Sequence, residues 1–248
     1  MTIETLRYSG VLGYYYDQKA IPFALCIVGF VLCAIIAYFL GSLNFGVILS
    51  KLKYRDDVRV HGSGNAGMTN MLRTYGKSAA VATFAGDGVK AVVAILIGTV
   101  ICGMIGSYLS GLFCVIGHIF PIFFGFKGGK GVVTAAFTAL ILDPLVFLIL
   151  LVVFLVVVIF TKYVSLASIM CMLMYPMMLY NFTPNPNEKF KVIFAFIIAV
   201  LIIFMHRSNI MRLKQGKENK ISIGKKNKKE KTSSAKTESA EASDKSEN

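Results

Sequence analysis

Seven long apolar stretches run through this sequence and leave few folds open to the chain. A helix needs about 17 to 25 apolar residues to cross the hydrocarbon core of a bilayer, although a helix buried in a bundle can be shorter. The stretches cover roughly residues 22–49, 79–102, 105–125, 130–142, 144–160, 164–182 and 190–206. The fourth is too short to cross unless it is tilted or buried. With 56% hydrophobic residues and a mean hydropathy of +0.67, the chain is expected to be an all-α, polytopic membrane protein with seven transmembrane helices.

The basic residues in the short connections predict the orientation of these helices. Most of them lie in the connections that follow the first, third, fifth and seventh apolar stretches. Because basic connections stay in the cytoplasm, we expect the N-terminus outside and the C-terminus in the cytoplasm. Residues 1–21 then form an outer extension, residues 22–213 the membrane domain, and residues 214–248 a basic cytoplasmic tail. The tail has too few apolar side chains to offset the entropy of ordering, so we expect it to be disordered.

The five cysteines do not suggest a metal site. They are scattered through apolar stretches, without a C-x-x-C pair or a histidine at ligand spacing. This pattern is typical of buried thiols. We therefore expect neither a metal nor a cofactor.

The first polar connection, HGSGNAGMTNMLRTYG at residues 61–76, has the composition of an anion-binding loop. Its glycines Gly62, Gly64 and Gly67 permit positive φ, so successive N–H groups can point into one concavity. Arg73 adds a guanidinium group suited to phosphate. Neutral hydrogen-bonding side chains complete the set, and these are Ser63, Asn65, Thr69 and Asn70. The alternative is an ordinary flexible loop.

A second polar connection, GFKGGKG at residues 125–131, is also rich in glycine and carries positive charge. Gly128 and Gly129 precede Lys130 at the expected start of the next helix, where the helix dipole favours an anion. The stretch lacks the G-x-x-x-x-G-K-[ST] pattern of a nucleotide-binding loop, which argues against ATP as the ligand. The sequence therefore predicts two phosphate-binding loops on the cytoplasmic side.

Asp87 and Lys90 are ionisable residues inside the second apolar stretch. They are three residues apart and share a helix face. Charged residues at such a depth are costly and tend to be functional. A supporting ion pair that joins helices is an equally good explanation. His118, among apolar residues, is more readily explained as a structural hydrogen-bonding residue than as a catalytic one.

Two common kinds of catalytic machinery are absent from the sequence. No histidine begins an H-x-x-x-x-D motif, and there is no G-x-S-x-G nucleophile elbow. Any reaction must therefore depend on held phosphates and a good leaving group rather than on an activated protein nucleophile.

Four motifs together resemble one family. GSGNAGMTNMLR, GDGVK, GHIFPIFFGFKGGKGV and HRSNIMRLKQGKENKI are similar, in content and order, to motifs of the bacterial acyl-phosphate-dependent glycerol-3-phosphate acyltransferases, the PlsY family. The resemblance runs from about residue 37 to residue 221. It implies a seven-span enzyme of the bacterial cytoplasmic membrane with cytoplasmic catalytic loops.

The resemblance also assigns expected roles to individual residues. Catalytic roles are expected for Ser63, Arg73, Lys130, His206 and Asn209. Phosphate-binding roles are expected for Asn65, Gly67, Thr69, Asn70, Gly128, Gly129 and Ser165, with Ser168 as the second choice for the hydroxyl between the fifth and sixth spans. Asp87 and Lys90 are expected to form a supporting ion pair.

The implied reaction moves a fatty acyl group from acyl phosphate to the 1-hydroxyl of glycerol 3-phosphate, giving lysophosphatidic acid and phosphate. The expected partners are these two substrates, membrane lipids and an upstream enzyme that forms acyl phosphate, with no nucleic acid. A transporter of phosphate or of a phospho-compound is the competing class. It would usually carry an internal repeat and polar residues on both halves of its spans, and neither is evident here. A lipid-binding scaffold would explain the basic surface but not the glycine motifs.

Overall fold

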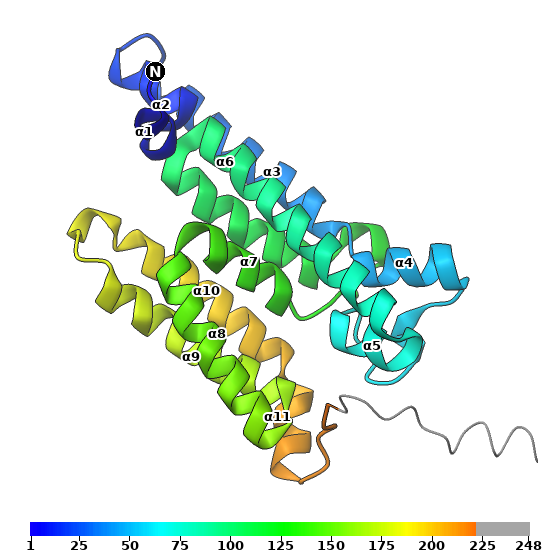
Figure 1. Cartoon of the computed structure of the whole chain (residues 1–248). Coiled ribbons are helices and arrows are strands. Elements are labelled where there is room, and N and C mark those ends of the chain that lie inside the picture. The colour runs from blue at the N-terminus through cyan, green and yellow to red at the C-terminus, as the bar shows by residue number, and fades with distance from the viewer. Residues whose placement is uncertain (222–248) are drawn as a thin grey trace, which may run out of the picture.

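The computed structural model describes residues 1–221, and over that range it contains helices and connecting loops but no strands (Figure 1). The α-helices are α1 (Ile3–Tyr8), α2 (Gly10–Asp17), α3 (Phe23–Ser42), α4 (Phe45–Tyr54), α5 (Met68–Tyr75), α6 (Lys77–Ile119), α7 (Val132–Leu142), α8 (Pro144–Thr161), α9 (Val164–Phe182), α10 (Phe190–Met205) and α11 (Arg207–Lys214). Three short 3₁₀ helices are η1 (Val58–Val60), η2 (Ile122–Phe124) and η3 (Pro186–Glu188).

All seven apolar stretches are helical, but the first ends earlier than predicted. The expected span over residues 22–49 is divided, because α3 stops at Ser42 and α4 starts at Phe45. Leu43 leaves the helical conformation, and the side chain of Asn44 accepts a hydrogen bond from the N–H of Val47 at 3.2 Å. This contact caps the N-terminus of α4. The break turns α4 away from the direction of α3 (Figure 1).

The second and third stretches form the two legs of α6. The helix is interrupted at Cys102 and Gly103, and Gly103 has φ +63°. A Cβ on Gly98 would lie 2.4 Å from the carbonyl oxygen of Gly106, so the two legs meet through main-chain atoms. The N-terminal helices α1 and α2 lie against this reversal (Figure 1). A Cβ on Gly10 would lie 2.3 Å from the nitrogen of Gly103, so no larger residue fits there.

Small residues also allow α3 to cross α6 closely. A Cβ on Gly41 would lie 2.2 Å from the carbonyl oxygen of Cys114, and one on Gly117 would lie 2.2 Å from the carbonyl oxygen of Tyr38. Helices in membranes associate mainly through such close packing, because lipid is as apolar as the side chains. The α3–α6 pair is therefore a rigid platform for the loops at its end.

The break between α3 and α4 is stabilised by the predicted pair of Asp87 and Lys90. The Lys90 ammonium lies 2.8 Å from Asp87 Oδ1, and both side chains are buried. Lys90 also donates to the carbonyl groups of Gly41 and Leu43, at 2.8 and 2.9 Å. His118 joins the pair, because its Nδ1 lies 2.9 Å from Lys90 Nζ. The buried charge thus satisfies the free carbonyl groups where α3 ends.

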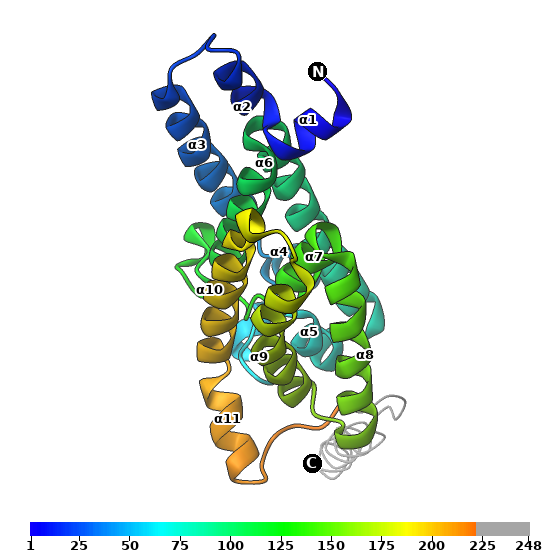
Figure 2. The same cartoon turned by 90° about the vertical axis from the view of Figure 1, so that its left-hand side faces the viewer.

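The remaining helices form a second group beside the α3–α6 pair. Helices α8, α9 and α10 pack together, and the short α7 lies between them and α6 (Figures 1 and 2). Within the described residues, four helices are long and apolar enough to cross a membrane, or five if the bent pair of α10 and α11 counts as one span. Many of their outward-facing side chains are apolar, including Phe160, Ile159 and Phe196. The glycine-rich loops, α5 and α11 all lie at one end of the molecule.

The described start of the predicted tail, residues 214–221, is ordered. Residues 214–221 were expected to be disordered, yet they fold back toward α9, where the N–H of Ile221 donates to the carbonyl of Lys162 at 2.9 Å. Lys220 lies over the ring of Tyr163. Residues 222–248, the rest of the predicted tail, lie outside the described residues.

Candidate active site

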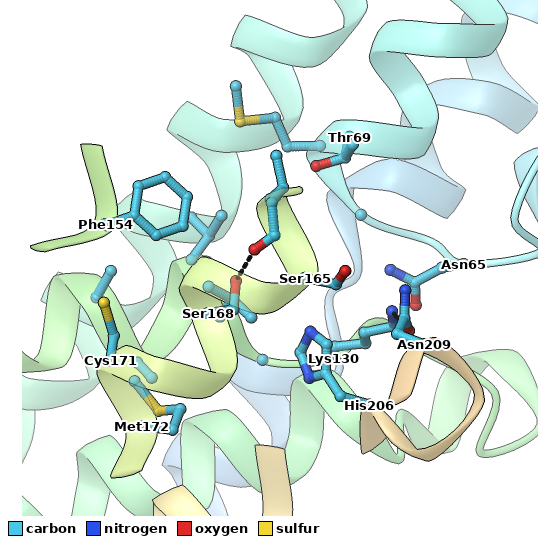
Figure 3. A pocket seen from close by; sticks show the side chains of 18 of the residues that line it. Asn65, Thr69, Lys130, Phe154, Ser165, Ser168, Cys171, Met172, His206 and Asn209 are labelled. Atoms are coloured by element: carbon cyan, nitrogen blue, oxygen red, sulfur yellow. Dashed lines mark hydrogen bonds between the residues drawn. The ribbon is translucent and has the colours of Figure 1, made fainter. Parts of the chain in front are cut away.

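Four separate segments enclose one cavity at the polar end of the bundle. The cavity has a volume of about 460 Å³. Its polar lining comes from the first glycine-rich loop with α5, from the second loop, from the start of α9, and from α11 with the following segment. Figure 3 shows Asn65, Lys130, Asn209 and His206 close together, with Phe154 and Met172 on the other side. The predicted convergence of these motifs on one site is therefore observed.

The first loop is folded around the side chain of Asn70. Its Nδ2 donates to the carbonyl groups of Val58 and His61, at 3.0 and 2.9 Å, and its Oδ1 accepts from the N–H of Ser63 at 2.9 Å. Gly62 is required here, because it has φ +56° and a Cβ would lie 2.3 Å from Asn70 Oδ1. Asn70 was expected to bind phosphate. Asn70 does line the cavity, but both of its amide hydrogens are used within the loop, so the hydrogen bonds it makes here shape the loop.

Other predicted residues of this segment line the cavity. They are Ser63, Asn65, Gly67, Thr69 and Arg73. Gly62 and Gly64 adopt positive φ, whereas Gly67 is extended with φ −124° and serves as the N-cap of α5. Arg73 donates to the carbonyl of Asn219 at 3.4 Å. No other hydrogen bond of its guanidinium occurs within residues 1–221, so most of its donors can serve a ligand.

The second loop carries Lys130 into the cavity directly before α7. Gly131 has φ +82° and is the N-cap of that helix. Lys130 is half-buried, and its ammonium donates to the side-chain oxygen of Asn209. Gly128 and Gly129, expected to bind phosphate, are not among the lining residues.

Gly128 and Gly129 instead pack against His118 at the end of α6. A Cβ on Gly128 would lie 2.0 Å from the carbonyl oxygen of His118, and one on Gly129 would lie 2.1 Å from its Nε2. The N–H of Gly129 donates to the same carbonyl at 3.1 Å. These glycines therefore allow the loop to lie directly on the buried Asp87–Lys90–His118 cluster. That contact explains their presence without a ligand.

Helices α9, α10 and α11 supply the remaining predicted side chains. Both Ser165 and Ser168 line the cavity, but Ser168 donates its hydroxyl hydrogen to the carbonyl of Val164 at 2.9 Å. His206 lies at the junction of α10 and α11, where its Nδ1 is 2.7 Å from the carbonyl oxygen of Ile202. The carbonyl accepts from Nδ1–H, so the neutral ring carries no proton on Nε2.

Glu218 is a residue of the site that sequence reasoning missed. Its Oε1 accepts from Ser165 Oγ at 3.0 Å and from Asn209 Nδ2 at 2.7 Å, and its Oε2 accepts from Arg212 Nε at 2.8 Å. Burial alone would raise the pKa of Glu218, but these three hydrogen bonds lower it, so the carboxylate is ionised. The signal was one acidic residue in a basic segment, close to Arg212.

Burial, together with the neighbouring cations, lowers the pKa of Lys130. Burial is the largest cause, and the positive charges of Arg212 and Arg73 act in the same direction, while Glu218 opposes them. The resulting pKa is about 8. Lys130 therefore begins to lose its charge only slightly above neutral pH.

If the charge on Lys130 is needed, kcat/KM should fall as the pH rises through about 8. This parameter reports groups of the free enzyme, and a lysine with that pKa loses roughly ninety per cent of its charge by about pH 9. We expect a roughly tenfold decline between about pH 7 and pH 9, measured with enzyme-free blanks for spontaneous substrate hydrolysis. Lys130→Arg keeps its charge and should show a flat profile. An equal decline in that variant would assign the titration to another group.

The far part of the cavity is apolar. Its lining there comes from α7, α8 and α9, and includes Leu140, Phe147, Leu151, Phe154 and Met172. Such a surface gains free energy by covering hydrocarbon. One cavity thus presents cations and amides at one end and an apolar wall at the other, as an amphipathic ligand requires.

Comparison with known proteins identifies the family. Residues 31–216 match the family model described as Glycerol-3-phosphate acyltransferase. A glycerol-3-phosphate acyltransferase of Finegoldia magna is 40% identical over 191 residues, covering 77% of this chain and 96% of the relative. Another, from Thermoanaerobacter pseudethanolicus, is 44% identical over 191 residues, covering 77% and 95% of the two chains.

Two solved structures share the fold. Both are crystal structures of PlsY (YgiH), an integral membrane glycerol 3-phosphate acyltransferase. The glycerol 3-phosphate form has a TM-score of 0.71 and 39% identity, covering 78% of this chain and 96% of that one. The lysophosphatidic acid form has a TM-score of 0.69 and 37% identity, covering 78% and 95%. The chain therefore belongs to the glycerol-3-phosphate acyltransferase family and has the integral membrane fold of PlsY.

Proposed function

We propose that the protein transfers a fatty acyl group from acyl phosphate to the 1-hydroxyl of glycerol 3-phosphate, giving lysophosphatidic acid and phosphate. The observation that carries this proposal is the single cavity that joins a cationic end to an apolar wall. The two related structures are a glycerol 3-phosphate form and a lysophosphatidic acid form. These ligands correspond to a substrate and a product of the proposed reaction.

The chemistry needs no covalent enzyme intermediate. The hydroxyl oxygen of glycerol 3-phosphate attacks the acyl carbonyl carbon, and the bond from that carbon to the phosphate oxygen breaks. The leaving phosphate takes the electron pair, and in the net reaction it also takes the hydroxyl proton. What the protein contributes is the placement of two anions and the stabilisation of charge on the carbonyl and leaving oxygens.

The two glycine-rich loops are proposed to hold the phosphates. Arg73 and Lys130 offset the repulsion between the two anionic substrates. Ser63, Asn65 and Thr69 donate neutral hydrogen bonds to phosphate oxygens, as their positions on the cavity wall allow. The leaving group is the phosphate of the acyl phosphate. Lys130 and Arg73 stabilise the negative charge that grows on this phosphate during transfer.

The opposite wall is proposed to complete the site. His206 and Asn209 contact the reacting groups from the junction of α10 and α11, and Ser165 adds a hydroxyl from α9. Glu218 orients Asn209 and Ser165 through the hydrogen bonds described above. Ser165 is preferred to Ser168 because Glu218 links it to Asn209 at the polar end of the cavity, whereas the Ser168 hydroxyl bonds only to a carbonyl of its own helix.

We further propose seven membrane crossings, formed by α3, the two legs of α6, and α7 to α10. The N-terminus then lies outside and the glycine-rich loops in the cytoplasm, in agreement with the distribution of basic residues. The corresponding location is the bacterial cytoplasmic membrane.

Reporter fusions at residue 248 test this orientation. A reporter that works only in the cytoplasm should be active there, and activity of a reporter that works only in the periplasm would contradict the orientation.

The choice of acyl donor tests the proposed function. Purified protein receives labelled glycerol 3-phosphate with either acyl phosphate or acyl-CoA, without added metal. We expect labelled lysophosphatidic acid with acyl phosphate only. Comparable turnover with acyl-CoA alone would overturn the proposal. Uptake of label into vesicles without acylation would favour a transporter instead.

A further inference from the structure

Arg59 lies on the short helix η1, directly before the first glycine-rich loop, and its guanidinium group binds the start of the second loop. Its Nε and Nη2 contact the two carboxylate oxygens of Asp57, with Nε–Oδ1 at 2.9 Å and Nη2–Oδ2 at 2.7 Å. Its Nη1 donates to the carbonyl groups of Phe124 at 2.8 Å and Lys127 at 2.9 Å. The planar fork of arginine can make all of these contacts at once, whereas a lysine cannot.

The short helix η1, which contains Arg59, also holds the first loop. The carbonyl of Val58 accepts the hydrogen bond from Asn70 that shapes this loop. The N–H of Val58 donates to Ser50 Oγ at 3.3 Å, and the Val58 side chain is fully buried. The position of η1 is therefore fixed relative to both α4 and the first loop.

The second loop is held at two points before it reaches Lys130. Arg59 binds the carbonyl groups at Phe124 and Lys127, and the N–H of Gly129 donates to the end of α6. Lys130 follows immediately. The distance of Lys130 from the first loop is therefore set by contacts of the main chain of the second loop. Two of these contacts, at Phe124 and Lys127, are made by Arg59.

We propose that the Asp57–Arg59 pair is a positioning device that fixes the spacing between the two phosphate-binding loops, and so places Lys130 opposite the first loop. Among residues 1–221, the side chains that line the cavity do not include Asp57 or Arg59, so the pair acts through other residues. Asp57 holds the guanidinium plane in the orientation that reaches both carbonyl groups. The hydrogen bond from Arg59 lowers the pKa of Asp57 to about 2, so the pair stays charged well into the acidic range.

A double-mutant cycle with Lys130 tests this inference, which rests on the proposed function. Arg59→Gln should lower turnover by about ten- to a hundredfold, because small displacements of a catalytic group are costly. In a Lys130→Ala background the same substitution should lower the residual rate by less than about twofold, since it acts through Lys130. Arg55→Gln is the matched control, because Arg55 is exposed and lies in the same connection. It should leave turnover unchanged.

The cycle is repeated with Arg59→Lys, which keeps the charge but cannot span the carboxylate and two carbonyl groups. If Arg59→Gln lowers the melting temperature too far for assay, the lysine variant decides, and we expect the same non-additive result. Equal fold losses in the two backgrounds would overturn the positioning role, and so would full activity of folded Arg59→Gln. Wild-type protein is assayed in parallel, so absence of any acyl transfer would contradict the proposed function rather than the role of Arg59.

Discussion

Lys130→Ala is expected to lower turnover by about a hundredfold or more. Loss of one preorganised electrostatic contact in an active site costs about 3 kcal/mol, which corresponds to roughly a hundredfold in rate. Lys130 is half-buried at the start of α7, where the helix dipole adds to its positive charge, and its ammonium is oriented by Asn209. The rate of acyl transfer by purified, folded variant is the measurement.

Lys53→Ala is the control for a change of net charge on the same end of the molecule. Lys53 is exposed on α4 and lies over the ring of Tyr54. Because exposed charges contribute little, its loss should change turnover by less than about threefold. Equal, mild effects of the two substitutions in folded protein would show that the second glycine-rich loop is structural and that the active site lies elsewhere.

Gly129→Ala is expected to lower kcat/KM by at least about tenfold, although no polar group is removed. The added Cβ would lie 2.1 Å from Nε2 of His118. The ring cannot move aside, because it is buried and its Nδ1 lies 2.9 Å from Lys90 Nζ. The loop must therefore shift, and it takes Lys130 with it. Kinetics and melting temperature of the purified variant check this prediction.

Gly125→Ala in the same loop is the matched control. A Cβ at Gly125 would have no neighbour within 4 Å, although its φ of +65° makes alanine somewhat strained. This variant should lose a little stability and little activity. If it lost as much activity as Gly129→Ala with both variants folded, general flexibility of the loop would explain the effect and the contact with His118 would not.

The sequence predicts the helices of this fold better than it predicts their ends. Apolar length identifies the long apolar helices within residues 1–221, because that signal is local. The break at Leu43 and Asn44 is only partly local: Asn44 caps α4, but the carbonyl groups of Gly41 and Leu43 are bound by Lys90 from another helix. No pattern within residues 22–49 reveals that contact.

In the site, too, features set by local sequence are predictable and features set by contacts between distant segments are not. Glycine-rich composition identifies two loops whose Lys130 and Arg73 line one cavity, but it does not distinguish a glycine that faces the cavity from one that faces His118. Gly128 and Gly129, predicted to bind phosphate, pack against His118 and lie outside the cavity lining. Composition also concealed Glu218, because a short polar segment can be ordered by specific polar contacts without an apolar core. In the sequence, Arg59 indicates only a positive charge on the predicted cytoplasmic side. Its hydrogen bonds to the carbonyl groups of Phe124 and Lys127 are visible only in the structure.

The buried pair on α6 has a consequence for how the chain enters the membrane. Asp87 and Lys90 are three residues apart on one helix, so they can neutralise each other before any other helix is in place. The other acceptors for Lys90 are at Gly41 and Leu43, in a helix that leaves the ribosome earlier, whereas His118 emerges later. The Lys90 ammonium group therefore has partners within its own helix and in the earlier chain before His118 is synthesised. We expect this order of partners to limit the exposure of the unpaired ammonium group to lipid during insertion.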